Sequence, residues 1–476
     1  MSSPWRGHGT PPRFDTLRIA SYPSTIVIRV SVLVVALSLL SLTAETRAAS
    51  GDRISNGRPR TIAVADVRPG MTGYGLTVFE GTHPDRFPIV VIGVLHNFLP
   101  LQDIILIRSD DPRLVHAGIV AGMSGSPIFI SGPDGDRLMG ALSYGWHFAK
   151  DPIAGVTPIA NMLAELDRPV RGREHTPAFE AAADRPASDR LARAGAPPRF
   201  GDHPLPPLPL DGASSTLARA AVPLSVAGFS ASSLEELTRA LGPYHITPMA
   251  AGGAARPGAD GPARFEPGGS ISVELVRGDM SMQGVGTVTW VDGDKVLAFG
   301  HPMFGLGEVY LPVATAEVHT VMASLSSSFK MASPLVEAGT LVQDRQSCIA
   351  ADMGHRSDMI PIHVRVSSPG GPDRDFHAEV VRHRFLTPLL ASTVIANAAQ
   401  EAASDVADAT ITVHTALDVR GYKELDLMDQ AFAPDGLSPK VFAAATGVKA
   451  IGDLLFTPSS RATFRVAFPS QAYSSA

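Results

Sequence analysis

The stretch Gly118-Ile-Val-Ala-Gly-Met-Ser-Gly-Ser-Pro-Ile-Phe-Ile130 sets one serine, Ser124, in a glycine-rich turn just before an apolar run. A nucleophilic serine needs a tight turn that projects its hydroxyl into a cleft, and Gly122 and Gly125 permit such a backbone because they lack a Cβ. The N–H groups of Gly122 and Ser124 would then converge as an oxyanion hole. The alternative interpretation is an ordinary Gly-Ser-Pro turn between two strands.

Strand-like runs occupy two blocks of the chain, at 60–165 and 268–370. These runs are short, apolar and bounded by Gly, Pro or Asp, a pattern that is typical of buried β-strands. Both blocks are therefore predicted to fold mainly as β-structure. The clearest runs are Phe87–Leu95, Asp103–Arg108, Ile271–Val276, Gly284–Val291 and Lys295–Phe299.

The composition changes between and after these blocks. Residues 166–222 are rich in Pro, Ala and Arg, which is typical of an extended or disordered linker. In the connecting segment 223–267, leucines three and four residues apart predict a short helix over Ser233–Leu241. The C-terminal accessory region 371–476 is predicted to hold one helix near Pro388–Ala402 and several strands. The candidates for a capping box on the first helix are Ser232 or Ser233 with Glu235 or Glu236.

Two motifs follow Ser124 in a fixed order, Gly140-Ala-Leu-Ser-Tyr-Gly145 and then Gly155-Val-Thr-Pro158 before a short helix. With the nucleophile turn, this order resembles the second barrel of chymotrypsin-like serine proteases. There a Gly-Asp-Ser-Gly-Gly-Pro turn precedes a substrate-lining strand and a strand that leads into a helix. The resemblance implies that Ser143, Tyr144 and Gly145 bind the substrate backbone as an extra strand.

The nucleophile segment is also similar to that of the SpoIVB-type peptidases of spore-forming bacteria, Gly-Gly-Ile-Val-x-Gly-Met-Ser-Gly-Ser-Pro. In that family an acidic residue in an Asp-Pro-Arg-Leu string precedes the motif, and Asp111-Pro-Arg-Leu114 matches it with two residues fewer before the serine. The family's later Asn-Asp-Pro-x-x-Gly segment resembles Lys150-Asp-Pro-Ile-Ala-Gly155. The resemblance implies that Asp111 completes a catalytic triad. An ordinary solvated turn is the alternative for Asp111, and Asp344 is the alternative acid.

A serine nucleophile needs a base, and histidine suits that role near neutral pH. Among fifteen histidines, His301 ends the string Lys295-Val-Leu-Ala-Phe-Gly-His301, and Gly284-Val-Gly-Thr287 stands upstream. This arrangement resembles the strand end that carries the histidine in both families, so His301 is the implied base. His116 and His147 lie closer to Ser124 in sequence, but neither follows such a strand.

The order of the two halves is reversed relative to these families, because Ser124 precedes His301 here. The resemblance covers roughly 65–165 and 270–365, and it implies a circular permutation. The expected fold is mainly β, with two chymotrypsin-like β-barrels in permuted order plus a C-terminal α+β or β-rich domain. If this is right, the fold must bring His301 within a few ångströms of Ser124.

Composition excludes several classes of function. The formal net charge of −6 leaves no basic excess to neutralise nucleic-acid phosphates. Cys348 is the single cysteine, which excludes an internal disulfide and a cysteine-rich zinc site. The sequence contains no His-Glu-x-x-His motif and no phosphate-binding glycine loop. We therefore expect no nucleic-acid partner, no metal and no cofactor.

Residues 1–49 are predicted to be a secretory signal or an N-terminal anchor. Arginines precede the apolar run Val30–Leu42 and small residues follow it, which is the order of a signal peptide. The run is shorter than the ~20 residues of a comfortable transmembrane helix, and an uncleaved anchor is the alternative. We expect an exported protein that is periplasmic, secreted or N-terminally membrane-anchored, with membrane contact only through this segment.

Together these patterns predict an exported serine endopeptidase with a Ser-His-Asp triad that hydrolyses peptide bonds through an acyl-enzyme. Its expected partner is a protein or peptide substrate. The alternative is a catalytically inactive protease-fold scaffold that binds a peptide or a cell-envelope partner, because fold alone does not establish function.

Overall fold

The computed structural model describes most of the chain between residues 59 and 467, all of it within one compact unit, Asn56–Ala476. The predicted signal segment 1–49 lies outside the described residues, as does 171–217 of the predicted linker. In the part that is described, no helix is long and apolar enough to cross a membrane. The described ranges are 59–146, 149–170, 218–219, 223–242, 246–253, 260–367, 372–383, 385–402, 409–418, 424–433, 441–442, 447–448 and 461–467.

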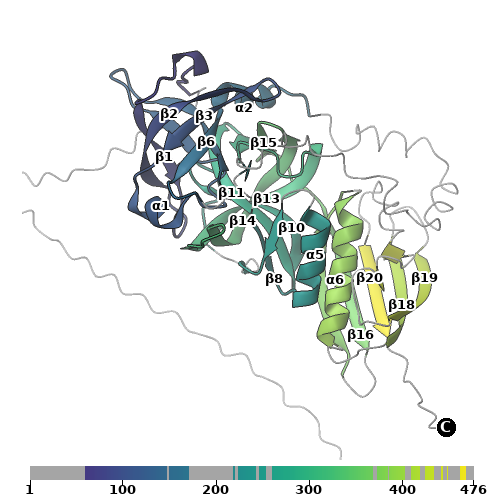
Figure 1. Cartoon of the computed structure of the whole chain (residues 1–476). Coiled ribbons are helices and arrows are strands. Elements are labelled where there is room, and N and C mark those ends of the chain that lie inside the picture. Colours follow the sequence, from purple (N-terminus) through teal and green to yellow (C-terminus); the bar gives the residue numbers. More distant parts are fainter. Residues whose placement is uncertain are drawn as a thin grey trace, which may run out of the picture. The chain divides into compact units, whose positions relative to one another are not determined.

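Six antiparallel strands of the N-terminal block close into a β-barrel (Figure 1). The order around it is β1-β2-β3-β6-β5-β4, and β4 pairs with β1 to close the ring. Buried side chains such as Phe87, Ile105 and Met139 form its core. The predicted mainly β fold class is thus confirmed. The elements are β1 (Thr72–Thr77), β2 (Asp85–Leu99), β3 (Gln102–Arg108), α1 (Pro112–Ala117), β4 (Pro127–Ile130), β5 (Arg137–Gly145), β6 (Ile153–Pro158) and α2 (Ile159–Leu166).

Six antiparallel strands of the second block also pair in a closed ring. β10 pairs with β13, the pairing continues through β14, β15 and β12 to β11, and β11 returns to β10. Its core contains Val273, Val288 and Leu341, which are fully buried. The strands are β10 (Ser270–Gly278), β11 (Ser281–Asp292), β12 (Lys295–Ala298), β13 (Gly307–Met322), β14 (Phe329–Arg345) and β15 (Cys348–Asp352).

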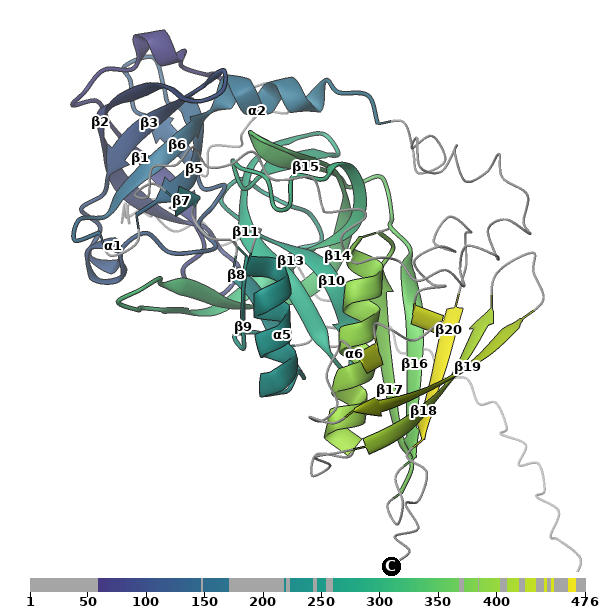
Figure 2. The same ribbon diagram turned by 45° about the vertical axis from the view of Figure 1, so that its right-hand side comes forward.

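The C-terminal strands extend the sheet of this second ring. β17 pairs with β10, and from β17 the order runs through β16, β20 and β18 to β19. The predicted boundary at residue 370 therefore falls between two paired strands. α6 packs on β16 and β17 and lies beside α5 in both views (Figures 1 and 2). The remaining elements are β7 (Ala218–Arg219), β8 (Pro223–Ala227), α5 (Ala231–Leu241), β9 (Thr247–Met249), β16 (Met359–Ser367), β17 (Arg374–Val381), α6 (Leu386–Ala402), β18 (Ala409–Asp418), β19 (Leu425–Ala433) and β20 (Arg461–Ala467).

Helix α5 begins earlier than the sequence predicts. Its N-cap is Ser230, whose hydroxyl accepts a hydrogen bond from the Ser233 backbone N–H at 3.3 Å. The capping box assigned to Ser232 or Ser233 is therefore wrong. Ser230 takes the role because its backbone is still extended, as an N-cap requires.

Asn397 on α6 ties that helix to the turn before α5. Its side chain is fully buried, accepts a hydrogen bond from the Ser230 N–H at 2.7 Å and donates one to the Gly228 carbonyl at 2.7 Å. We predict that Asn397→Leu lowers the free energy of unfolding by about 1–3 kcal/mol, because both bonds are lost at a buried site. Urea denaturation measures the change. Replacing exposed Glu401 by Gln is the control, and an equal effect of the two substitutions would contradict this role for Asn397.

Candidate active site

Ser124 and His301 lie in hydrogen-bond contact, although 177 residues separate them in sequence. Nε2 of His301 is 2.9 Å from Oγ of Ser124. Ser124 belongs to the turn between α1 and β4 of the first barrel, and His301 follows β12 of the second ring. The predicted proximity of these two residues is confirmed.

The imidazole of His301 is oriented by a backbone carbonyl. Its Nδ1 lies 2.8 Å from the carbonyl oxygen of Pro302. A carbonyl only accepts hydrogen bonds, so this contact favours the tautomer that carries its proton on Nδ1. The lone pair of Nε2 then faces the Ser124 hydroxyl, which is the geometry that a general base requires.

The two residues before His301 have an unusual backbone conformation. Phe299 and Gly300 both have positive φ angles, +69° and +70°. The conformation is costly for a bulky residue such as Phe299, whose ring is fully buried. A Cβ on Gly300 would lie 2.0 Å from Oγ of Ser143, so only glycine allows β5 to approach this closely. The backbone here thus packs the histidine turn directly on the first barrel.

Strand β11 of the second ring donates hydrogen bonds to the backbone carbonyl groups of the Ser124 turn. Thr287 donates twice, from its backbone N–H to the Ser124 carbonyl at 2.8 Å and from Oγ1 to the Gly122 carbonyl at 2.9 Å. Thr289 Oγ1 donates to the Gly125 carbonyl at 2.7 Å. A Cβ on Gly125 would lie 1.9 Å from the Thr287 carbonyl oxygen, so this position must be glycine. Strand β11 of the second ring therefore fixes the position of the Ser124 turn.

Gly122 and Gly125 have the positive φ angles, +97° and +98°, that the sequence predicts for a nucleophile turn. The Gly122 backbone N–H has no acceptor among the residues that the structure describes. An oxyanion hole formed by the N–H groups of Gly122 and Ser124 stays a prediction.

The structure does not bring Asp111 to His301. Asp111 is the N-cap of α1, and its carboxylate accepts hydrogen bonds from the Arg113 backbone N–H at 2.9 Å and from Nη2 of Arg113 at 2.9 Å. The Arg113 guanidinium holds the pKa of Asp111 below its usual value. The Asp-Pro-Arg-Leu string that suggested a triad acid thus begins a helix, with its carboxylate already engaged.

Asp344, the alternative acid, organises the loop that follows His301. Its buried carboxylate accepts hydrogen bonds from the backbone N–H groups of Met303 at 2.8 Å, Phe304 at 2.9 Å and Leu306 at 3.2 Å. Burial raises the pKa of Asp344, while these donors oppose that shift. Asp344 therefore supports the position of His301 through the backbone.

The predicted substrate strand is the C-terminal part of β5. Ser143 is buried and donates from Oγ to the Ala141 carbonyl at 2.8 Å. Tyr144 is buried, and Tyr144 and Gly145 pair through their backbones with β7, a segment of the chain itself (Figure 2). The binding role of these three residues stays a prediction.

Lys330 is a residue of the site that the sequence analysis missed. It is fully buried on β14, and its Nζ donates to Oγ1 of Thr77 at 2.8 Å and Oγ1 of Thr287 at 3.2 Å. Burial lowers the pKa of Lys330 to about 7. Its aliphatic chain packs on Gly122. A lysine in an otherwise ordinary strand gives no sequence signal, because its burial depends on contact with the other barrel.

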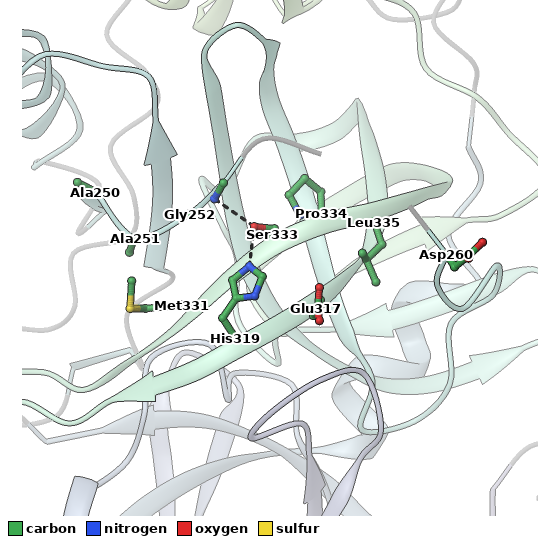
Figure 3. A pocket seen from close by; sticks show the side chains of 11 residues that line it. Ala250, Ala251, Gly252, Asp260, Glu317, His319, Met331, Ser333, Pro334 and Leu335 are labelled. Carbon is green, nitrogen blue, oxygen red and sulfur yellow. Dashed lines mark hydrogen bonds between the residues drawn. The ribbon is translucent and has the colours of Figure 1, made fainter. Parts of the chain in front are cut away.

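A second serine–histidine contact lies in a surface pocket beside β13 and β14 (Figure 3). Nε2 of His319 is 2.8 Å from Oγ of Ser333, which also accepts a hydrogen bond from the Gly253 N–H at 3.1 Å. Ser333 lies within β14, where it pairs with Glu317 of β13, and His319 is exposed. This serine lacks a tight turn that could present an oxyanion hole. The pair is a weaker candidate than Ser124 and His301.

The described residues contain no group of three His, Cys, Asp or Glu side chains that could hold a metal ion. Cys348 is a buried free cysteine, and burial raises the pKa of its thiol. A thiol held neutral in this way is a poor nucleophile.

We predict that Lys330→Met abolishes a pH dependence of stability that the wild type shows above pH 7. The folded protein binds this proton with a pKa of about 7, against 10.5 for an ordinary lysine. Between these values the unfolded chain binds more protons, so wild-type stability rises with pH, by at most about 1.4 kcal/mol per pH unit. Below about pH 7 both states are protonated and the slope disappears.

Urea denaturation of both proteins from about pH 6 to pH 9 measures this difference. The stability difference between wild type and Lys330→Met must grow with pH in favour of the wild type. A difference that is constant across this range would contradict the burial of a titrating amine at this position.

Compared with known proteins, the chain matches no family model, no curated protein and no solved structure.

Proposed function

We propose that the protein is a serine endopeptidase in which Ser124 is the nucleophile and His301 is the general base. The observation that carries the proposal is the 2.9 Å contact between Nε2 of His301 and Oγ of Ser124, with Nδ1 held by the Pro302 carbonyl. A serine hydroxyl becomes an effective nucleophile only when a positioned base removes its proton. The glycine turn around Ser124 supports the same role, because it can expose N–H groups to an oxyanion.

In the proposed reaction, Oγ of Ser124 attacks the peptide carbonyl carbon while Nε2 of His301 takes its proton. The Gly122 and Ser124 N–H groups stabilise the oxyanion, and His301 then protonates the leaving amine as the C–N bond breaks. Water attacks the acyl-enzyme in the same way and releases the acid. The Pro302 carbonyl orients the imidazole and stabilises its protonated form.

Two features of the sequence extend the proposal. The motif similarity to SpoIVB-type peptidases supports a peptide substrate over another acyl group, and the signal-like segment 1–49 supports action outside the cytoplasm. No cofactor is needed for this chemistry.

The second candidate function is a peptide-binding scaffold without catalysis. One observation favours it: the side chains of Ser124 and His301 are 0% and 1% exposed. A substrate reaches Oγ only after the atoms that cover it move. The two candidates therefore differ in whether Ser124 reacts at all.

Labelling with a fluorophosphonate probe, which reacts only with activated serines, separates the candidates. We expect Ser124→Ala to abolish labelling and His301→Ala to lower its rate by about 100-fold or more, because the base is lost. Ser126→Ala is the matched control, since Ser126 Oγ lies in the same turn but donates to the Met123 carbonyl at 2.7 Å. Retained labelling in Ser124→Ala would overturn the proposal, and absence of labelling both in wild type and in a variant whose β7 cannot pair with β5 would favour the scaffold.

The two candidate acids give a further prediction. Asp111→Asn should keep the labelling rate within about threefold, because asparagine also caps helices and Asp111 does not contact His301. Asp344→Asn should lower the rate at least about tenfold, because an amide NH₂ cannot accept from the backbone donors of residues 303–306. Loss of labelling in folded Asp111→Asn would restore Asp111 as the orienting acid.

A further inference from the structure

The edge of β5 beside the Ser124 turn is occupied by the chain itself. β5 pairs with β6 along one edge, and with β4 along the first half of the other edge. β4 ends its pairing at Ala141, and β7 then continues the same edge, with Arg219 opposite Tyr144 and Ala218 opposite Gly145. The short gap between these two partners is where the Ser124 turn lies.

Hydrogen bonds place the Ser124 turn in that gap. The Gly125 N–H donates to the Leu142 carbonyl at 2.8 Å, and the Leu142 N–H donates to the Ser126 carbonyl at 2.9 Å. Leu142 therefore separates the part of β5 that pairs with β4 from the part that pairs with β7. A peptide on Tyr144 and Gly145 is the direct continuation of this edge from the nucleophile turn.

The direction of β7 leads toward Ser124. β7 runs antiparallel to β5, so a step from Ala218 to Arg219 is a step from Gly145 toward Leu142. Four residues after Arg219, Pro223 begins β8, which pairs with β11, the strand that holds the Ser124 turn. β7 thus pairs beside the Ser124 turn, and β8 pairs with the strand that holds that turn.

We propose that β7 is an internal occupant of the Tyr144–Gly145 edge of β5, the edge that the sequence resemblance assigns to the backbone of an extended peptide. An incoming peptide must displace β7, so the chain inhibits its own site. The inference rests on the proposed function, and it adds the regulation of that site. Because β7 is tethered, its effective concentration is in the millimolar range or above, and a free peptide that makes only backbone bonds competes poorly.

A released variant, in which β7 can no longer pair with β5, tests whether freeing this edge speeds the reaction of Ser124. Replacing Ala218 and Arg219 together by Pro removes both backbone N–H groups of β7 and prevents regular pairing. We expect fluorophosphonate labelling of Ser124 to become about tenfold faster or more. The control is Val170→Pro, which places a new proline at the exposed opposite end of the linker and should label as wild type does. Circular dichroism verifies that each variant is folded.

A locked variant tests the proposal in the other direction. Gly145→Cys combined with Ala218→Cys places two thiols directly opposite each other on paired strands, a spacing that a disulfide spans. A Cβ at Gly145 meets only Ile119 at 3.4 Å, an ordinary contact, and the natural Cys348 is buried. Oxidation should lower the labelling rate about tenfold or more, and a reductant should restore it. Each single cysteine variant should not respond to reductant.

Hydrogen exchange at the Tyr144 and Gly145 amides distinguishes failure of this inference from failure of the proposed function. Equal labelling of Ser124 in wild type, released and locked proteins would overturn the inference and leave the hydrolase intact. If no protein labels, the proposed function fails, and exchange alone decides the inference. Faster exchange in the released variant, slowed again by a synthetic peptide of residues 214–224, would support β7 as the occupant of the Tyr144–Gly145 edge. Unchanged exchange would overturn it.

Discussion

The fastening of the Ser124 turn onto strand β11 is the contact on which the rest of the site depends. Carbonyl groups of Gly122, Ser124 and Gly125 all accept hydrogen bonds from Thr287 or Thr289. Two of the three donors are hydroxyls of Thr287 and Thr289, which are fully buried, so water does not compete for these hydrogen bonds. The first barrel carries Ser124, and strand β11 of the second ring fixes the position of its turn.

Thr287 also accepts a hydrogen bond from Lys330, which helps to accommodate an ionisable side chain in the core. Lys330 donates to Thr77 of one barrel and Thr287 of the other, so two hydroxyl acceptors match the two N–H donors of a neutral amine. Protonation adds a third N–H, which has no acceptor among the described residues, and a charge that burial disfavours. The protonation state of Lys330 therefore affects the packing of the first barrel against the second ring.

The sequence alone predicts the parts of the site that depend on local backbone geometry. Ser124 and His301 could be found because each lies in a glycine-containing turn next to an apolar strand, within a motif that resembles those of known serine proteases. Asp111 was misplaced because the string Asp-Pro-Arg-Leu is also a good helix start, and a single chain does not show which use prevails. The strand-rich blocks follow from the pattern of apolar runs and the barrel was implied by the family resemblance, whereas the joining of β17 to β10 depends on long-range pairing that neither indicates.

The separation of 177 residues between Ser124 and His301 has a consequence for synthesis. At about 5–20 residues per second, the histidine is translated about 9–35 s after the serine. During most of that interval the Ser124 turn lacks β11, which carries its hydrogen-bond donors, and throughout it lacks His301. The contact between Ser124 and His301 therefore forms only after well over half of the chain has been made.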